Sequence, residues 1–396
     1  MNKETKNILL MLIRGQTSNF GNIIFDYANR LLIASLGSKS SFFMMIYQSS
    51  ESTVQLLLNL FTGHIADHNN RQKTLIITDL IAGIATFLLF LYYNPKNIWA
   101  FIIVNIILAI LFSFNRPTYK AIVKDLLSKE GIYRYNSLSK LIAEMVAISA
   151  PLICIFIIQQ FGFKYGMLIN SLSFFISAFC EYRFQLLKRT ASNKMNMAKG
   201  IIDGFKYVFY DKSLLIILVA SAFLNFLDAI YSFYLPFTSV FSRFDGIYAY
   251  ILVAQSIGSI IGAICTSLIK KQLAPNQFFH LLISAAMSLI LVGFFHTVQL
   301  LILIMFGLFS FSVVIFNINL MSYLQLSVDS EFLGRIFSII FMISSLFIPL
   351  GSYVAAVINM KNWSVFQYIG VGQFVIYLIC LLIFTVMNRV NKNNCN

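Results

Sequence analysis

The sequence predicts an all-α integral membrane protein with about twelve transmembrane helices in two six-helix repeats. Of its 396 residues, 59% are hydrophobic and only 11% are charged, whereas soluble domains carry about 25% charged residues. The mean hydropathy is +0.80. The apolar runs are about 20 residues long, the length of a membrane-spanning helix, and lack the alternation of a β-barrel strand.

The apolar runs form two sets of six around a central polar stretch. Backbone groups in lipid must be hydrogen-bonded within their own segment, so each run is expected to be helical. The first set is expected near residues 8–36, 41–65, 74–93, 97–120, 138–160 and 163–186, and the second near 213–241, 246–269, 276–298, 299–324, 334–358 and 363–388.

This pattern predicts three parts: an N-terminal six-helix bundle over 1–190, a linker over 191–212 and a C-terminal six-helix bundle over 213–396. Apolar and basic residues alternate at helical spacing within the linker. An amphipathic helix on the anionic cytoplasmic surface would explain this pattern, and a solvated linker helix is the alternative.

Lys and Arg residues are distributed unevenly between the two sides of the membrane. With both termini in the cytoplasm, 22 of the 29 basic residues fall in cytoplasmic segments and 5 in outside loops. The positive-inside rule therefore places both termini in the cytoplasm, in the plasma membrane of what we expect to be a bacterium. The net charge of +14 thus reflects topology, and no nucleic-acid partner is expected.

The two halves resemble diverged copies of each other. The segment around Pro151 matches that around Pro349 at an offset of 198 residues, and Gly63 corresponds to Gly262 at an offset of 199. Paired six-helix repeats are common in secondary transporters, whose substrate sites lie near the bilayer midplane between the repeats. We therefore expect such a site here.

The loop after the second expected span reads GHIADHNNRQKTL, residues 63–75. Its Gly63, Asp67, Arg71 and Lys73 resemble the loop signature of the major facilitator superfamily, although Asn70 stands where that signature usually has glycine. A glycine lets two helices approach closely, and Asp67 could meet a neighbouring helix N-terminus. The resemblance implies a conformational gate made of Gly63, Asp67, Arg71, Lys73, Arg116, Pro151, Gly334, Arg335 and Pro349.

Further segments resemble the same family, and the macrolide-efflux-like branch of its drug:proton antiporters in particular. They are LINSLSFFISA (168–178), AKGIIDGFKYVF (198–209) and EFLGRIFSII (331–340). The Gly-Pro-x-x-Gly-Gly run of many such antiporters is reduced here to the proline, Pro151. The resemblance implies a monomeric transporter without a cofactor, whose partners are a small-molecule substrate, protons and the lipid bilayer.

Polar residues inside the spans recur on single helix faces, and charged ones there are functional candidates. The candidate proton-coupling residues are Asp26, Glu51, Asp228 and Glu144. The candidate substrate cavity consists of Asn19, Asn22, Arg30, Gln48, Gln55 and Asn225.

Some of these charges have simpler interpretations. Asp26 could neutralise Arg30 one turn further on, and Lys140 is well placed to pair with Glu144. Asp79 and Glu181 lie near the ends of expected helices, so we expect them to reach the membrane interface. His64 and His68 have a metal-ligand spacing, but they flank the loop signature and no metal site is expected.

The favoured function is therefore proton-coupled efflux of an amphiphilic small molecule such as a drug, macrolide-like compound, siderophore or peptide, by alternating access. One alternative is an importer or lipid flippase on the same fold. Another is a transport-inactive membrane sensor or immunity protein. No enzymatic activity is expected, because neither a P-loop nor a nucleophile–base constellation is recognisable.

The charge distribution makes a prediction about topology. In a variant without the five native cysteines, a cysteine at Lys96 or Lys361 should react with a membrane-impermeant maleimide added to intact cells. A cysteine at Lys129 or Lys194 should react only after the cells are opened. Labelling of 194 but not 361 in intact cells would reverse the orientation.

Overall fold

The computed structural model describes residues 3–68, 71–187, 212–268, 279–327 and 346–394, together with Gln277 and Met342. The chain divides into two compact units, here unit 1 (residues 1–194) and unit 2 (residues 195–396). Nearly all of the expected linker over 191–212 lies outside the described residues, so its amphipathic helix stays a prediction.

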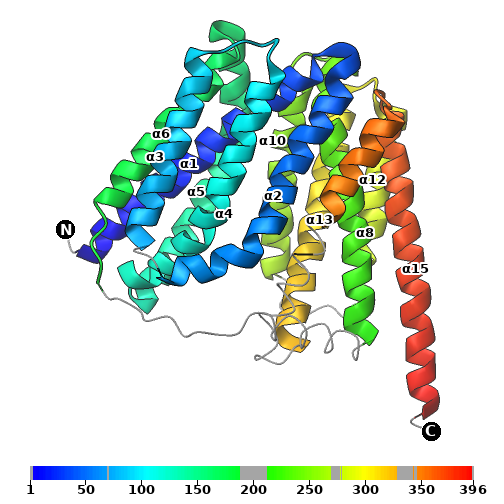
Figure 1. Ribbon diagram of the computed structural model, residues 1–396. Coiled ribbons are helices and arrows are strands. Elements are labelled where there is room, and N and C mark those ends of the chain that lie inside the picture. The colour runs from blue at the N-terminus through cyan, green and yellow to red at the C-terminus, as the bar shows by residue number, and fades with distance from the viewer. Residues whose placement is uncertain are drawn as a thin grey trace. The chain divides into compact units, whose positions relative to one another are not determined.

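The described part of unit 1 contains six long helices, coloured from blue to green in Figure 1. They are α1 (Lys3–Ala34), α2 (Ser40–His68), α3 (Arg71–Leu91), α4 (Ile98–Leu126), α5 (Lys129–Phe161) and α6 (Lys164–Tyr182), with a short 3₁₀ turn η1 (Gly37–Lys39) before α2. Helix α1 packs against α5 and α6, α3 against α4 and α6, and α2 against α4.

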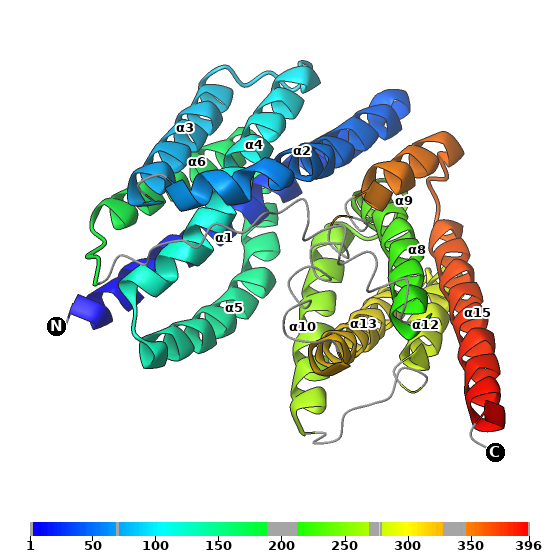
Figure 2. The same ribbon diagram turned by 60° about the horizontal axis from the view of Figure 1, so that its bottom comes forward.

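The described part of unit 2 contains the other six long helices. They are α8 (Lys212–Tyr234), α10 (Ile247–Leu268), α12 (Leu281–Phe295), α13 (Gln299–Ser327), the unlabelled helix Leu346–Ile358 and α15 (Ser364–Asn394). After α8 come the short turns η2 (Leu235–Phe237) and α9 (Thr238–Phe241). Helix α12 packs against α13 and α15, as Figure 2 shows, and α10 packs against α13.

These helices confirm the prediction of an all-α membrane fold with twelve spanning helices. Among the described residues, seven helices are long and apolar enough to cross a membrane by length and composition alone. Helices α1 and α2 are long enough but carry charged residues along their length, for example Arg14 and Asp26 on α1.

Side-chain hydrogen bonds join the helix ends at one end of unit 1, where α1 begins and α4 and α6 end. The Asn7 amide donates to the carbonyl oxygens of Leu126 (3.1 Å) and Gln185 (2.8 Å). Glu4 accepts hydrogen bonds from the backbone and hydroxyl of Ser128, the N-cap of α5. These hydrogen bonds lower the pKa of the Glu4 carboxyl from its ordinary value. Three helix ends are thus held together by groups that would otherwise need water.

Backbone contact fixes the α10–α13 pair in unit 2. A Cβ atom added to Gly258 would collide with the carbonyl oxygen of Gly307, and one added to Gly262 would lie 2.7 Å from the carbonyl oxygen of Phe311. Small residues allow this approach in membrane helices, where van der Waals packing and not the hydrophobic effect holds helices together.

This contact predicts a contrast between two helical glycines. Gly258→Ala should lower the melting temperature of the purified protein, because overpacking costs about 1–3 kcal/mol. Gly15→Ala is the matched control, since a Cβ there meets only ordinary contacts of 3.8 and 3.9 Å. Alanine favours helix over glycine, so this control should be neutral or stabilising. Equal melting temperatures for the two variants would contradict the close approach.

Candidate functional site

Two charged pairs lie near each other in unit 1. On α1, the Asp26 carboxylate contacts the Arg30 guanidinium at 2.8 Å, one helical turn apart. On α2, Glu51 lies 3.8 Å from Arg116 of α4 and accepts a 2.8 Å hydrogen bond from the Gln55 amide. Glu51 is also close enough to Asp26 and Arg30 to interact with them electrostatically. The local pairing considered for Asp26 is therefore present, and Glu51 has a cation from another helix.

Neutral polar groups lie on the same three helices as these pairs. The Asn29 amide donates to the Tyr47 hydroxyl at 3.3 Å, and the Asn105 amide donates to the Tyr47 carbonyl at 3.0 Å. Gln48 is buried beside them on α2. Asn19 and Asn22 are partly buried on α1, and Asn22 lies 3.5 Å from the Ser18 hydroxyl. Their role as a substrate cavity stays a prediction.

Unit 2 contains a cavity of about 290 Å³ beside Asp228. Its polar lining comes from Ser221, Asn225, Asp228, Asn317 and Gln373, and its apolar lining includes Phe309 and Phe316. Asp228 makes no hydrogen bond or ion pair with another residue in the part of the chain that the structure describes. The buried Oε1 atom of Gln373 also has no donor among those residues. The cavity therefore presents two acceptors that a proton or a ligand donor could satisfy.

A buried cluster in unit 1 corrects one prediction. Asp79 and Glu181 were expected at the membrane interface, but they are 2% and 0% exposed. Both contact Arg14 of α1, at 3.4 and 2.8 Å. Glu181 does lie in the last turn of α6, as expected, yet Arg14 and the neighbouring helices cover it. The prediction failed because Arg14, which pairs with both acids, is far from them in the sequence.

The loop signature is described only in part. Gly63 and Asp67 lie in the last turns of α2, where the side chains are outside the described set, and Asn70 is also outside it. Helix α3 begins at Arg71, whose guanidinium contacts the Asp125 carboxylate at the end of α4 at 2.7 Å. Asp125 is a partner that the sequence pattern did not reveal.

The other expected gate residues have varied placements. Pro151 is buried within α5, Pro349 is partly buried in the helix Leu346–Ile358, and Lys73 is exposed on α3. Gly334 and Arg335 lie outside the described residues. Glu144 pairs with Lys140 at 2.6 Å, as their spacing suggested. On α8, the Asn225 amide donates to the Ser221 carbonyl at 2.7 Å.

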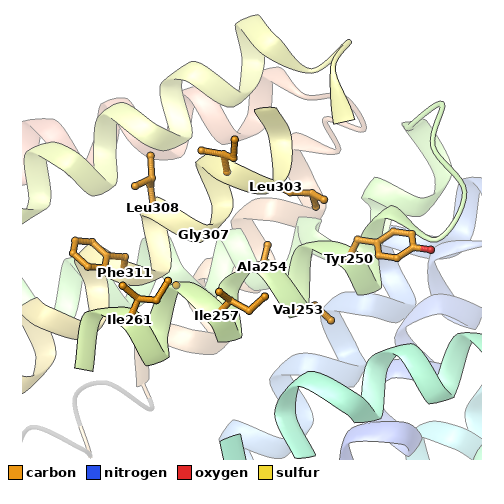
Figure 3. Close-up of a pocket in the computed structure, with 11 residues that line it drawn as sticks. Tyr250, Val253, Ala254, Ile257, Ile261, Leu303, Gly307, Leu308 and Phe311 are labelled. Atoms are coloured by element: carbon orange, nitrogen blue, oxygen red, sulfur yellow. The ribbon is translucent and has the colours of Figure 1, made fainter. Parts of the chain in front are cut away.

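A second cavity in unit 2 is almost entirely apolar. It measures about 510 Å³ and lies along α10 and α13, where Figure 3 shows Ala254, Ile257 and Ile261 beside Leu303, Leu308 and Phe311. Gly258 and Gly307, which approach each other closely, also line it. A surface of this kind suits hydrocarbon, and Tyr250 brings a hydroxyl group to its lining.

The fold and the family match together define a helical membrane transporter. The family model of the Major Facilitator Superfamily matches residues 17–352, and the chain belongs to that superfamily. It is therefore a membrane protein of a family whose members move small molecules across membranes and are not enzymes.

Two relatives of the same name resemble the chain over most of its length. Macrolide efflux protein A of Streptococcus pyogenes is 22% identical over 354 residues, 83% of this chain and 83% of that protein. The protein of the same name from Enterococcus faecalis is 22% identical over 309 residues, 73% of this chain and 92% of that protein. The resemblance to macrolide-efflux proteins noted from the sequence is confirmed.

Solved transporter structures share the fold. The nucleoside transporter NupG, in the structure of a point mutant, superposes with a TM-score of 0.75 at 15% identity, over 97% of this chain and 100% of that chain. A D-xylose-proton symporter superposes with a TM-score of 0.74 at 11% identity, over 96% and 97%. At such identities the likeness describes the fold and not the substrate.

The Arg71–Asp125 pair makes a prediction by charge exchange. Asp125 is only 6% exposed, and removing one partner of a buried pair costs about 3–5 kcal/mol. Arg71→Asp and Asp125→Arg should each lower the folded yield, and the double variant should recover part of it. Size-exclusion chromatography of a fluorescent fusion would measure this.

The control is the same exchange at Lys140 and Glu144, a more exposed pair on one helix. Exposed pairs of this kind contribute about 0.3–0.5 kcal/mol, so its single variants should keep nearly the parental yield. A double variant at 71 and 125 that is no better than its worse single variant would refute the pairing.

Proposed function

We propose that the chain is a proton-coupled exporter of an amphiphilic small molecule, working by alternating access in a bacterial plasma membrane with both termini in the cytoplasm. The observation that carries this proposal is the cavity at Asp228. It combines four neutral polar side chains and an aromatic wall with the Asp228 carboxylate, which has no hydrogen-bond or ion-pair partner among the described residues. An amphiphile needs such a mixture, because its apolar part must leave water while its few polar groups keep hydrogen-bond partners.

Charge makes Asp228 the leading candidate for the proton carrier. An ionised carboxylate without a cation is costly in the membrane interior, and protonation removes that cost. Asp26 and Glu144 each have a cation within 2.8 Å, which reduces the gain from taking up a proton. Glu51 is intermediate, since Arg116 lies 3.8 Å away.

The proton gradient is a sufficient source of energy. Moving one charge across about 100 mV of membrane potential supplies about 2.3 kcal/mol. One or two inward protons could therefore maintain a useful outward gradient of solute. The relatives named macrolide efflux protein A favour export and a bulky amphiphile as substrate.

The loop signature would control the conformational change. In this proposal Asp67, Arg71 and Lys73 act with Arg116, Pro151, Gly334, Arg335 and Pro349 as the gate, and the protein works as a monomer. The contact of Arg71 with Asp125 supports a role for this loop in joining α3 to α4.

The coupling proposal predicts different results for individual acids. A solute is first found by screening compounds for those that raise the melting temperature, since ligands that bind only the folded state stabilise it. In proteoliposomes, adding that solute should move protons with the parental protein, and Asp228→Asn should abolish the pH change while keeping solute binding. Glu51→Gln and Asp26→Asn should have smaller effects.

Asp245→Asn is the control, because Asp245 is exposed in the loop after α9. Each variant must also match the parent in folded yield, so that loss of coupling is separated from loss of protein. Full coupling in well-folded variants at Asp26, Glu51 and Asp228 would refute this assignment and leave Glu144 as the next candidate. Uptake of the solute down an inward proton gradient would show an importer.

A further inference from the structure

Arg14, Asp79 and Glu181 form a buried cluster in unit 1 that the proposed transport cycle does not use. Their exposed fractions are 8%, 2% and 0%, and they come from α1, α3 and α6. Asp79 lies eight residues after the first residue of α3, about 12 Å along the helix. The cluster therefore lies inside the protein, towards the end where α1 begins and α6 ends.

The hydrogen bonds to the two carboxylates leave one oxygen without a donor. The Arg14 guanidinium donates to Glu181 Oε1 at 2.8 Å and to Asp79 Oδ2 at 3.4 Å. The Asn115 amide donates to Asp79 Oδ1 at 2.8 Å. Glu181 Oε2 is buried and has no partner among the described residues. The carboxyl groups of Asp79 and Glu181 are neighbours, because both contact the same Arg14 guanidinium.

The neighbouring donors are already used elsewhere. The Tyr119 ring lies against the Arg14 guanidinium, 4.1 Å from it, and its hydroxyl bonds with the Tyr135 hydroxyl (2.9 Å) and the Met11 carbonyl (3.3 Å). The Ser177 hydroxyl contacts the backbone carbonyls of Arg14 and Ser173. The titratable and charged groups that face the cluster are thus Arg14 on α1, Asp79 on α3, Tyr119 on α4, Tyr135 on α5, and Cys180 and Glu181 on α6.

The net charge of the cluster, like its hydrogen bonds, indicates that one proton is missing. Two ionised carboxylates and one guanidinium leave a net charge of minus one in a site that excludes water. Uncompensated charge in such a place is strongly destabilising. One proton removes the excess charge and supplies the missing hydrogen bond, because a protonated carboxyl has an O–H that can donate to the other carboxylate.

We propose that Asp79 and Glu181 together bind one proton in the folded protein at neutral pH, which makes this cluster a proton-binding site separate from the acids of the candidate transport site. The proton lies between the two carboxyl groups, and Arg14 balances the charge that remains. The inference concerns proton binding alone and holds whether the solute is exported, imported or absent.

Infrared spectroscopy of the purified protein tests this site, because a protonated carboxyl has a carbonyl band that shifts in deuterated water. At neutral pH the parental protein should show this band. Glu181→Gln and Asp79→Asn should each lower its intensity by the contribution of one protonated carboxyl group. Either change leaves one carboxylate for one guanidinium, so the remaining acid ionises. Asp245→Asn, in an exposed loop, should keep the full band.

A difference spectrum between the parent and both variants that contains no such band would refute the proposal. Glu181→Gln should also fold with the parental yield, because its amide can donate to Asp79 as the O–H does. If that variant alone fails to fold, Glu181 is needed as a carboxylate and the proposal is wrong. Asp228→Asn should leave the difference bands of Glu181→Gln and Asp79→Asn unchanged, which separates this site from the proposed proton carrier.

Discussion

The neutralisation of charge inside a membrane bundle is the constraint on which the rest of the structure depends. Ionised groups in lipid must be paired within the protein, and unit 1 meets this demand by joining helices that are distant in sequence. Arg14 connects α1 to α3 and α6, Arg71 connects the start of α3 to the end of α4, and Arg116 connects α4 to α2. The arrangement of the helices in unit 1 therefore places each of these arginines next to an acidic residue on another helix.

Unit 2 follows a different principle. Its core is apolar and aromatic, with Tyr231 packed among Phe306, Phe309 and Phe366. Asp228 is the acid that lines its polar cavity, and no described cation pairs with it. The two halves thus keep the same helical plan while the polar chemistry has diverged. Charge pairs join helices in unit 1, whereas Asp228 has no ion-pair partner among the described residues of unit 2.

The sequence predicted the fold well because hydrophobic runs and loop charges are local signals. All twelve described long helices fall close to the expected segments, and the pairs of Asp26 with Arg30 and of Lys140 with Glu144 could be anticipated because they lie one turn apart. The Arg14 cluster could not be anticipated, since its acids are 65 and 167 residues away from the arginine. Pairing between helices depends on which faces meet, and hydropathy does not specify that.

The close approach of Gly258 and Gly307 also limits how unit 2 can move. The contact leaves no room for a Cβ atom at Gly258, so sliding α10 along α13 would replace this glycine with a residue that collides with the Gly307 backbone. Such a helix pair keeps a fixed register and moves as one rigid unit. Any change of shape in unit 2 must then come from bending within helices or from shear at other helix pairs, where side chains and not backbones are in contact.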